Sequence, residues 1–288
     1  MRGLRQAEAV SRPAATEPCA CCEDSPVRVP YHRAVPRTSP PRKTPEQLRR
    51  ARSLLAALKR RHPDAHCELH WTQPHELLVA TILSAQSTDV GVNRATPALF
   101  AAFPTPAHYA AATPDAIAPF LRTLNFWRNK ARAVHESMRA VHERFGGEVP
   151  RTMDALLTLR GVARKTANVV LGNAFGMNEG VVVDTHVGRL ALRMGLSRHT
   201  DPGKVEQDLM ALFPRRDWCL LSHLLIFHGR RACKARGGAC ASDALCRRFC
   251  SESAKPVRKK TAKPKRPSTS RAPRHQAATR QRPSRRSD

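Results

Sequence analysis

Apolar residues in the middle of the chain recur at the spacing of an amphipathic helix. Leu54, Leu55 and Leu58 share one helical face with Leu48. Two later stretches repeat in the same way, every three or four residues, which is the period of an α-helix. These stripes predict helices over residues 45–60, 74–85 and 128–145. Since no two adjacent runs alternate with the period of two that marks a sheet, the chain is predicted to be all-α.

The predicted helices often begin at a polar residue followed by proline. The pairs are Thr44-Pro45, Thr105-Pro106, Thr113-Pro114 and Asp201-Pro202. The Thr or Asp oxygen accepts a hydrogen bond from a free amide of the first turn, and proline suits the first helical position. Residues 180–183 are the one β-like run, and we expect a buried extended connector there.

Basic residues are abundant at the ends of the chain and also between them. The formal net charge is +27. Residues 254–288 contain 13 Lys and Arg against one acid, and residues 1–43 contain eight against four, so residues 44–253 still carry +11. A basic folded region favours nucleic acid as partner, although solubility or an arginine-rich proteome would give the same excess. Both ends lack periodicity, and we expect a disordered arm over 1–43 and a basic disordered tail over 254–288.

The nine cysteines fall into three kinds. No apolar run approaches the roughly 18 residues of a membrane-spanning helix, and no secretory signal is visible. We therefore expect an intracellular, reducing compartment, in which a late group of cysteines favours metal binding over disulfides. Cys19, Cys21 and Cys22 are expected to be free thiols or a metal site, and Cys67 and Cys219 to be buried hydrophobic residues.

A helical hairpin is predicted in the second half of the chain. Thr152 can cap a short helix that runs through Leu159, and the turn at residues 160–163 leads into a second helix over 164–175. A tight glycine-containing turn before a helix presents backbone amides that suit a phosphate. Many such helix pairs bind nothing, so the hairpin alone does not establish DNA binding.

Lys165 and Asp184 are the candidate catalytic pair. Lys165 lies at the start of the second hairpin helix, and Asp184 follows an apolar run. An amine must be neutral to act as a nucleophile, and the first turn of a helix disfavours its ammonium form. A nearby carboxylate can stabilise a developing cation. The alternatives are a phosphate contact for Lys165 and a simple cap of a helix over 185–194 for Asp184.

Three segments resemble the endonuclease III family of DNA glycosylases, namely residues 83–89, 161–171 and 183–186. The resemblance covers about residues 45–250. The family usually has proline where Arg160 stands and glycine where Ala163 stands. Loss of the proline frees the turn and adds charge near the phosphate. Alanine costs about 1 kcal/mol if position 163 needs a left-handed backbone.

The resemblance implies an all-α fold with two helical lobes. Residues 68–178 would form a six-helix barrel domain that contains the helix-hairpin-helix at about 153–175. Residues 44–67 and 179–253 would form a second domain with the terminal helices and an iron–sulfur cluster loop. The disordered arms would flank these domains.

The resemblance also implies a bifunctional DNA glycosylase and abasic-site lyase of base excision repair. Such an enzyme removes oxidised pyrimidines from duplex DNA through a lysine Schiff base and β-elimination, here with Lys165 and Asp184. Its partner would be double-stranded DNA with damaged bases or abasic sites. We expect a monomer in a bacterial cytoplasm or nucleoid, without membrane association.

The implied DNA contacts come from the hairpin and from residues that fill the space of an extruded base. Gln86 matches the family's inserted glutamine, and Phe126 aligns with an apolar wedge; a helix cap and ordinary core are the alternatives. His186 either contacts the site or packs beneath it, and Trp127 fits the core. The full set of expected contacts is Gln86, Phe126, Gly161, Val162, Ala163, Arg164, Thr166 and His186.

The late cysteines are Cys233, Cys240, Cys246 and Cys250, in the order C-x6-C-x5-C-x3-C. The family binds a 4Fe–4S cluster with C-x6-C-x2-C-x5-C, so Asp243 stands where the third cysteine would fall. Four thiolates still suit a cubane, while zinc, which usually takes tighter knuckles, and unligated thiols are alternatives. A cluster here would fold a short basic loop with Arg230, Arg231, Lys234 and Arg236 towards phosphates.

Two other functions fit part of these features. A monofunctional mismatch or alkylation glycosylase would use the same scaffold without a Schiff base. The resembling adenine glycosylases keep the aspartate but lack the lysine, so Lys165 favours the bifunctional enzyme. A non-catalytic DNA-binding protein would use the hairpin and the tails only to hold phosphates.

Overall fold

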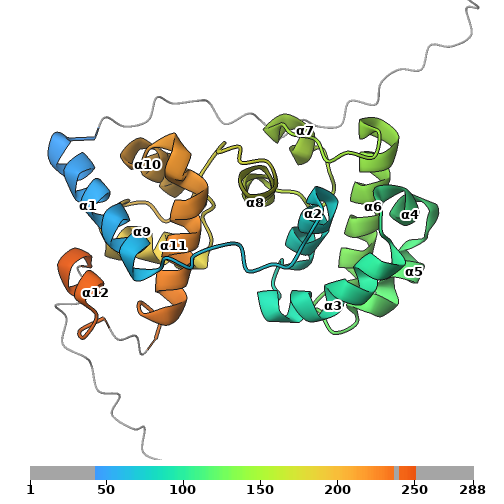
Figure 1. Ribbon diagram of the computed structural model, residues 1–288, viewed down its shortest axis with the longest axis horizontal. Coiled ribbons are helices and arrows are strands. Elements are labelled where there is room, and N and C mark those ends of the chain that lie inside the picture. Colours follow the sequence, from blue (N-terminus) through green and yellow to red (C-terminus); the bar gives the residue numbers. More distant parts are fainter. Residues whose placement is uncertain (1–42, 237–239, 251–288) are drawn as a thin grey trace, which may run out of the picture. The chain divides into compact units, whose positions relative to one another are not determined.

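The computed structural model describes residues 43–236 and 240–250, so residues 1–42 of the predicted arm over 1–43, the predicted tail over 254–288, and Cys19, Cys21 and Cys22 lie outside the described residues. Within these ranges every regular element is helical and no strand occurs, which confirms the all-α prediction (Figure 1). The α-helices are α1 (Pro45–Arg61), α2 (Pro74–Leu83), α3 (Asp89–Ala102), α4 (Pro106–Ala111), α5 (Pro114–Ile117), α6 (Trp127–Phe145), α7 (Met153–Leu157), α8 (Arg164–Ala174), α9 (Thr185–Arg193), α10 (Pro202–Leu212), α11 (Trp218–Arg231) and α12 (Ala244–Phe249). Two 3-10 helices, η1 (Ala118–Leu121) and η2 (Arg215–Asp217), complete the set for the described ranges.

Most of the predicted helix caps form. Thr44 and Gln47 make a reciprocal capping box at the start of α1. The Gln47 amide donates to Thr44 Oγ1 at 3.2 Å, and the Thr44 amide donates to Gln47 Oε1 at 2.9 Å. Thr113 and Asp201 likewise accept from amides of the first turn. Thr105 differs, because its hydroxyl pairs with the His108 ring at 2.8 Å. The prediction of a side-chain cap was therefore wrong at α4.

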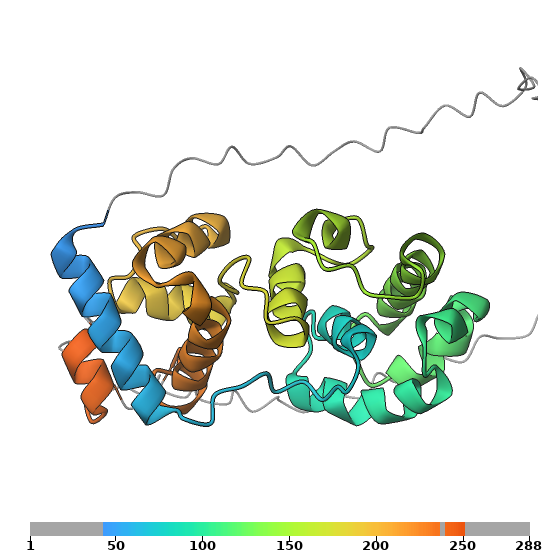
Figure 2. The same ribbon diagram turned by 45° about the horizontal axis from the view of Figure 1, so that its top comes forward.

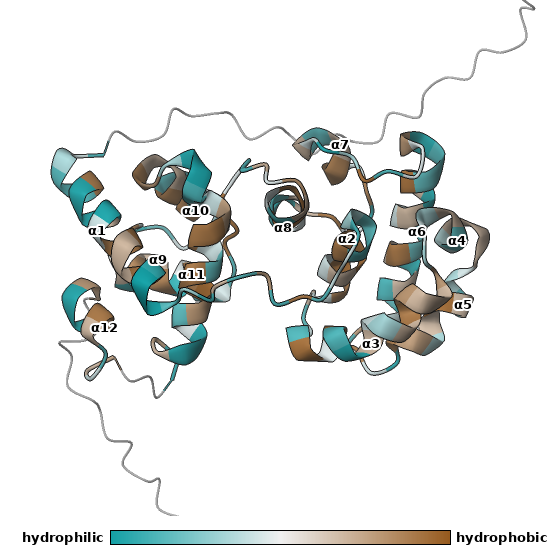
Figure 3. Cartoon of the chain, viewed as in Figure 1, coloured by the Kyte–Doolittle hydropathy of each residue, from teal (hydrophilic) through white to brown (hydrophobic). Residues whose placement is uncertain are grey.

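The first hydrophobic core surrounds α2. All residues of α2 from Leu77 to Leu83 are buried, so this helix is apolar around most of its circumference. Helices α3, α6 and α8 contact it. The predicted stripe on α6 buries Val134, Met138 and Val141, while the other face of the helix is polar (Figure 3). The hairpin helix α8 belongs to this core through Ala167, Val170 and Leu171.

The second core joins the two ends of the described chain. α1 buries Ala51 and three leucines against α10, α11 and α12. α1 and α12 lie side by side although they are far apart in sequence (Figure 2). α9 also belongs to this core. Whether the two cores are separate domains, over 68–178 and over 44–67 plus 179–253, stays a prediction.

The predicted connector at residues 180–183 has no regular secondary structure and leads from one core to the other. Val181 and Val182 are buried, and the Val182 amide donates to Ser222 Oγ at 2.9 Å. A Cβ at Gly180 would overlap the carboxylate of Glu206. Glycine is required here by the close approach of that side chain.

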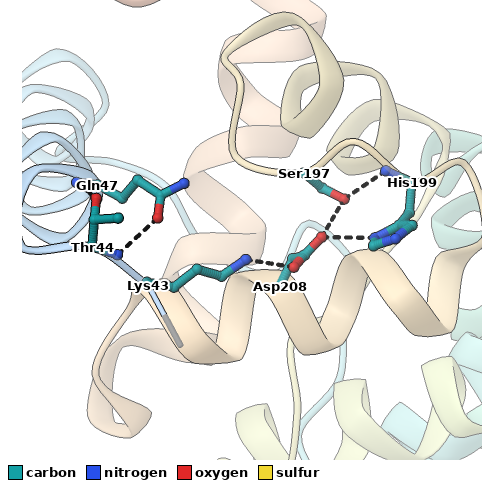
Figure 4. A network of polar contacts seen from close by, with 6 residues as sticks. All are labelled: Lys43, Thr44, Gln47, Ser197, His199 and Asp208. Atoms are coloured by element: carbon teal, nitrogen blue, oxygen red, sulfur yellow. Dashed lines mark hydrogen bonds and ion pairs between the residues drawn. The ribbon is translucent and has the colours of Figure 1, made fainter. Parts of the chain in front are cut away.

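A buried carboxylate of α10 binds the segment that precedes α1. Asp208 of α10 receives Lys43 Nζ at 2.6 Å, Ser197 Oγ at 2.7 Å and His199 Nδ1 at 2.9 Å (Figure 4). Burial disfavours the charge, yet these hydrogen bonds hold the pKa of Asp208 below its usual range. The network ties the segment before α1 to α10.

Cys67 and Cys219 are less enclosed than expected. Both are partly buried, and Cys67 packs against the first core. Burial raises the pKa of both thiols, that of Cys219 to about 11, so they resemble apolar residues rather than nucleophiles. Among the described helices, none combines the length and apolarity needed to cross a membrane.

Candidate active site

Lys165 and Asp184 line the same groove, which has a volume of about 730 Å³. Ser87 in the turn after α2, Asp89 at the start of α3 and Arg230 near the end of α11 also line this groove. Lys165 comes from the first turn of α8 in the first core, and Asp184 from the start of α9 in the second. The structure thus places both members of the candidate pair in one groove.

The residue with a left-handed backbone in the hairpin turn is Gly161, not Ala163. Gly161 has φ +78°, whereas Ala163 has φ −93° and ψ 169°, an extended backbone open to any residue. The expected cost of alanine at 163 therefore does not arise. A Cβ at Gly161 would also lie 3.3 Å from the Cβ of Ala133, because the turn packs against α6 and α2.

The side chains of the hairpin are placed differently from one another. Val162 is buried in the first core, so only its backbone can meet a phosphate. Gly161 and Ala163 are exposed and Thr166 is partly exposed. Arg160 Nη1 forms an ion pair with Glu136 at 2.6 Å. The charge that replaces the family's proline is therefore paired within the protein.

Arg164 is bound by Glu206 of α10 and is half-exposed, so its expected contact with DNA stays a prediction. Its Nε donates to Glu206 Oε2 at 2.8 Å, and Asn168 Nδ2 donates to Glu206 Oε1 at 2.9 Å. Glu206 is 6% exposed. Arg164 and Asn168 are one helical turn apart on α8, so a single carboxylate fixes the helix that carries Lys165.

Asp184 caps α9, which is the alternative role that the sequence analysis gave for this residue. Its Oδ1 accepts a hydrogen bond from the Val187 amide at 2.8 Å and so caps α9. The same residue lines the groove beside Lys165. A capped carboxylate has a fixed position, so the cap and an electrostatic role are compatible.

Asp89 is a further carboxylate of the groove that the sequence analysis did not single out. Burial raises its pKa, Lys165 lowers it and Asp184 raises it, so the three charges lie within interaction range. The net shift of the Asp89 pKa is upward, and Arg230 Nη2 pairs with the carboxylate at 2.7 Å. Only the motif around it (residues 83–89) could have indicated Asp89, because its partner Arg230 lies far along the chain.

The arginines at the end of α11 are paired with acids of the protein. Arg230 also contacts Glu68, and Arg231 binds both oxygens of Asp64, at 2.9 and 2.6 Å. Acids of the protein neutralise both side chains, which also line the groove, so the expectation that they face phosphates stays a prediction. Lys234 and Arg236 are exposed.

His186 both lines the groove and packs beneath it. Its Nδ1 lies 3.2 Å from Arg189 Nη2. A Cβ at Gly229 of α11 would stand 3.0 Å from the same ring nitrogen. The two roles left open by the sequence are therefore both present, and Gly229 is needed for the close approach of α11.

Gln86 and Phe126 are exposed beyond the groove, in two different turns. Phe126 is 61% exposed and precedes α6, so it is not a core residue. Trp127 packs partly against the first core, as expected, with Arg128 stacked 4.0 Å over its ring. Gln86 has a left-handed backbone with φ 52°. It does not cap α3, because Thr88 does.

The late cysteines converge. The Sγ atoms of Cys233, Cys240 and Cys246 lie within 4.8 Å of one another, with 3.8 Å between Cys233 and Cys240. Cys250 is buried at the end of α12. A hydrogen bond from Cys246 and another from Arg193 Nη1, at 3.3 Å, lower the pKa of Cys233. A buried group of thiols with a stabilised thiolate fits a metal centre.

Asp243 has a different task from the cysteine that the family has there. Its Oδ1 accepts a hydrogen bond from the Cys246 amide at 2.9 Å and caps α12. His228, completely buried, lies 3.2 Å from Cys246 Sγ and 3.1 Å from His62. These contacts orient Cys246 from two sides.

Residues 79–215 match the family described as "HhH-GPD superfamily base excision DNA repair protein". The fold and the groove thus define a helix-hairpin-helix protein of DNA base excision repair. Endonuclease III of Synechocystis is 49% identical over 204 residues, which cover 71% of this chain and 93% of the relative. Endonuclease III of Bacillus subtilis is 43% identical over 189 residues, covering 64% of this chain and 86% of the relative.

A solved structure with similar architecture is described as a trapped endonuclease III–DNA covalent intermediate. Superposition of that structure on this chain gives a TM-score of 0.68, and the two sequences are 40% identical. The match covers 72% of this chain and 96% of that chain. The chain belongs to the endonuclease III family. Membership confirms the expected enzyme class, a DNA glycosylase and abasic-site lyase of base excision repair.

Proposed function

We propose that Lys165 is the nucleophile and that Asp184 stabilises the cation formed during base removal. The observation that carries this assignment is the groove shared by Lys165 and Asp184. Neutral Lys165 Nζ would attack C1′ of the damaged nucleotide. The N–C1′ bond forms as the glycosidic bond breaks, and the base leaves with that electron pair and takes up a proton.

The second half of the reaction follows from the same amine. Nitrogen then loses one proton, and its electron pair expels the sugar ring oxygen from C1′. That oxygen takes up a proton and becomes a hydroxyl, which leaves a protonated Schiff base. Removal of a C2′ proton then expels the 3′ phosphate with the electron pair of the C3′–O bond, which is β-elimination. Water finally hydrolyses the Schiff base and returns the free amine. Asp184, fixed by its cap on α9, would stabilise positive charge at C1′.

The substrate we infer is duplex DNA that contains an oxidised pyrimidine or an abasic site. A solved relative is described as a covalent intermediate with DNA, and residues 44–253 of this chain carry a net charge of +11. We propose that the amides at residues 161–163 bind a phosphate, that Gln86 and Phe126 enter the base stack, and that Thr166 and His186 line the DNA-binding face. The enzyme would act as a monomer, in a bacterial cytoplasm or nucleoid, consistent with its bacterial relatives.

We infer that Cys233, Cys240, Cys246 and Cys250 hold a 4Fe–4S cluster with a structural role, as the family generally does. A specific distance favours a second candidate, zinc. With metal–sulfur bonds of about 2.3 Å, the sulfurs of a tetrahedral site stand about 3.8 Å apart, which is the distance between Cys233 and Cys240. A cubane binds each thiolate at a different iron and would need the sulfurs to separate. Iron and zinc analysis of the purified protein, with its visible absorbance, distinguishes the two.

The catalytic assignment is tested by trapping with borohydride on a duplex that contains an abasic site. The wild type should form a covalent adduct and nick the strand. Lys165→Gln should abolish both and still bind duplex DNA, whereas Asp184→Asn should slow base removal. Lys204→Gln, on the exposed first turn of α10, is the matched control and should behave as wild type. An adduct formed by Lys165→Gln would assign the nucleophile elsewhere, and no adduct with the wild type would favour a monofunctional or a non-catalytic protein.

A further inference from the structure

Two exposed turns each hold one side chain in a backbone conformation that favours glycine. Within the described residues, Gln86 with φ 52° and Phe126 with φ 57° are the two non-glycine residues with positive φ. Left-handed backbone is unfavourable for a residue with a Cβ and persists only where neighbouring structure imposes it. Since Phe126 is 61% exposed, burial of its ring is not the cause. Gln86 and Phe126 each combine an unfavourable backbone conformation with an exposed side chain. Since core packing does not explain this combination, it indicates a function for both turns.

The two turns are tied to each other by side chains. Asn125 Nδ2 donates to the carbonyl oxygen of Gln86 at 2.8 Å. Lys130 Nζ, from the first turn of α6, donates to Ser87 Oγ at 2.7 Å. The Lys130 amide also donates to the Phe126 carbonyl at 3.0 Å. Both links run from the Phe126 side, since Asn125 and Lys130 donate to the turn that holds Gln86.

Lys130 is an unusual residue for its position. It is 6% exposed, and burial lowers the pKa of its amine. A buried amine is costly unless it is hydrogen-bonded. An apolar side chain would fill this site at a lower cost, so the packing of α6 does not explain the lysine. Its contact with Ser87 does.

We propose that Asn125 and Lys130 are positioning residues that lock Gln86 and Phe126 into a single wedge before DNA binds. This inference rests on the proposed function, in which a damaged base leaves the stack and protein side chains fill the space. A wedge formed in advance loses little conformational freedom on binding, which leaves more of the binding energy for extrusion of the base. The contacts act on extrusion and not on the chemistry at Lys165.

The test compares three substrates in single-turnover assays. The first holds an oxidised pyrimidine opposite its complementary purine, the second holds the same lesion opposite an abasic analogue that leaves it unpaired, and the third holds a preformed abasic site. The variants are Asn125→Ala, Lys130→Met and Ser87→Ala. Ser87→Thr restores the hydroxyl, and Asn129→Ala removes an exposed amide from the same turn of α6 as the matched control.

Asn125→Ala and Lys130→Met should each slow excision of the paired lesion about tenfold, which corresponds to about 1.4 kcal/mol and thus to about one hydrogen bond. The loss should fall to about threefold or less on the unpaired lesion, and abasic-site cleavage and borohydride trapping should stay within about twofold of wild type. In the ratio of the paired-lesion rate to the unpaired-lesion rate, Ser87→Ala should follow Lys130→Met, and Ser87→Thr and Asn129→Ala should match wild type. Lys130→Met should unfold at the same temperature as wild type or higher, which a merely structural lysine would not allow.

Equal losses on all three substrates, or no loss on the paired lesion, would overturn the proposed wedge. These outcomes are separate from failure of the catalytic assignment. If wild type does not form a borohydride adduct on the abasic site, the proposed function itself falls. If the adduct forms normally and only the pairing dependence is missing, the chemistry stands and the positioning role is wrong.

Discussion

Replacing Glu206 by alanine should destabilise the enzyme more than its distance from the groove suggests. The side chain is 6% exposed and accepts hydrogen bonds from Arg164 and Asn168, both on α8. Glu206→Ala removes both acceptors and leaves the Asn168 amide buried, since Asn168 is 4% exposed. The guanidinium of Arg164 can return to water, because that side chain is 49% exposed.

The two losses differ in size. An unpaired buried amide costs about 1–3 kcal/mol, whereas an ion pair with one half-exposed partner contributes about 0–1 kcal/mol. Together with the space left by the missing carboxylate, Glu206→Ala should lower the free energy of unfolding by about 2–4 kcal/mol. For a domain of about 200 residues this corresponds to a fall of about 5–12 °C in Tm. Glu206→Gln keeps an acceptor for Asn168 and should cost about 1 kcal/mol or less.

Urea unfolding followed by circular dichroism measures both variants against wild type. The reasoning would be refuted if Glu206→Ala changed the free energy of unfolding by less than about 1 kcal/mol, the size of an exposed ion pair. It would equally be refuted if Glu206→Gln were as costly as Glu206→Ala, because the ion pair and not the buried amide would then carry the effect.

Three further perturbations test other parts of the structure. Gly180→Ala should be strongly destabilising in the same unfolding assay, since a Cβ would displace Glu206 and Asn168; wild-type stability would mean that the carboxylate moves freely. Asp243→Ala should cost about 1 kcal/mol by removing the cap of α12 and should speed metal loss to a chelator, with Asp243→Asn as the capping control. The pKa of Asp208 is lowered in the folded state. The stabilisation of the fold by this carboxylate is therefore complete above the ordinary carboxyl pKa of about 3.9, and it is lost as the pH falls through the lower folded pKa. Asp208→Asn should therefore weaken the acid dependence of stability in that pH window, and an unchanged acid limb would contradict the network at Lys43.

The sequence predicts those parts of the fold that depend on local chemistry. Apolar periodicity and polar-proline pairs predict α1 and α6 within a residue or two and the start of α10. The sign of φ in the hairpin turn did not follow from the resemblance, because Gly161 and not residue 163 is left-handed. That choice is made by packing of the turn against Ala133 and Ile82, residues far away in the sequence.

The contacts that position the site were hidden from the sequence for a related reason. In the sequence Glu206 is one charged residue of an ordinary amphipathic helix. Its role becomes visible only in the structure, where it binds Arg164 and Asn168 of α8. Asn125 and Lys130 gain their meaning only when the turn before α6 meets the turn after α2. Periodicity and motifs describe residues near each other in the chain, whereas these pairs are separated by about 40 residues.

The candidate site depends on the geometry between the two cores. Lys165 stands on α8 in the first core and Asp184 on α9 in the second, so neither core contains the pair by itself. The connector at residues 180–183 limits their separation, and the contacts of Arg164 and Asn168 with Glu206 hold α8 against the second core. A small misplacement of a reacting group is costly, because attack requires near contact and alignment. Glu206→Ala should therefore slow borohydride trapping even at temperatures where the variant is fully folded, while Glu206→Gln should not. Normal trapping by folded Glu206→Ala would show that the connector alone sets the distance.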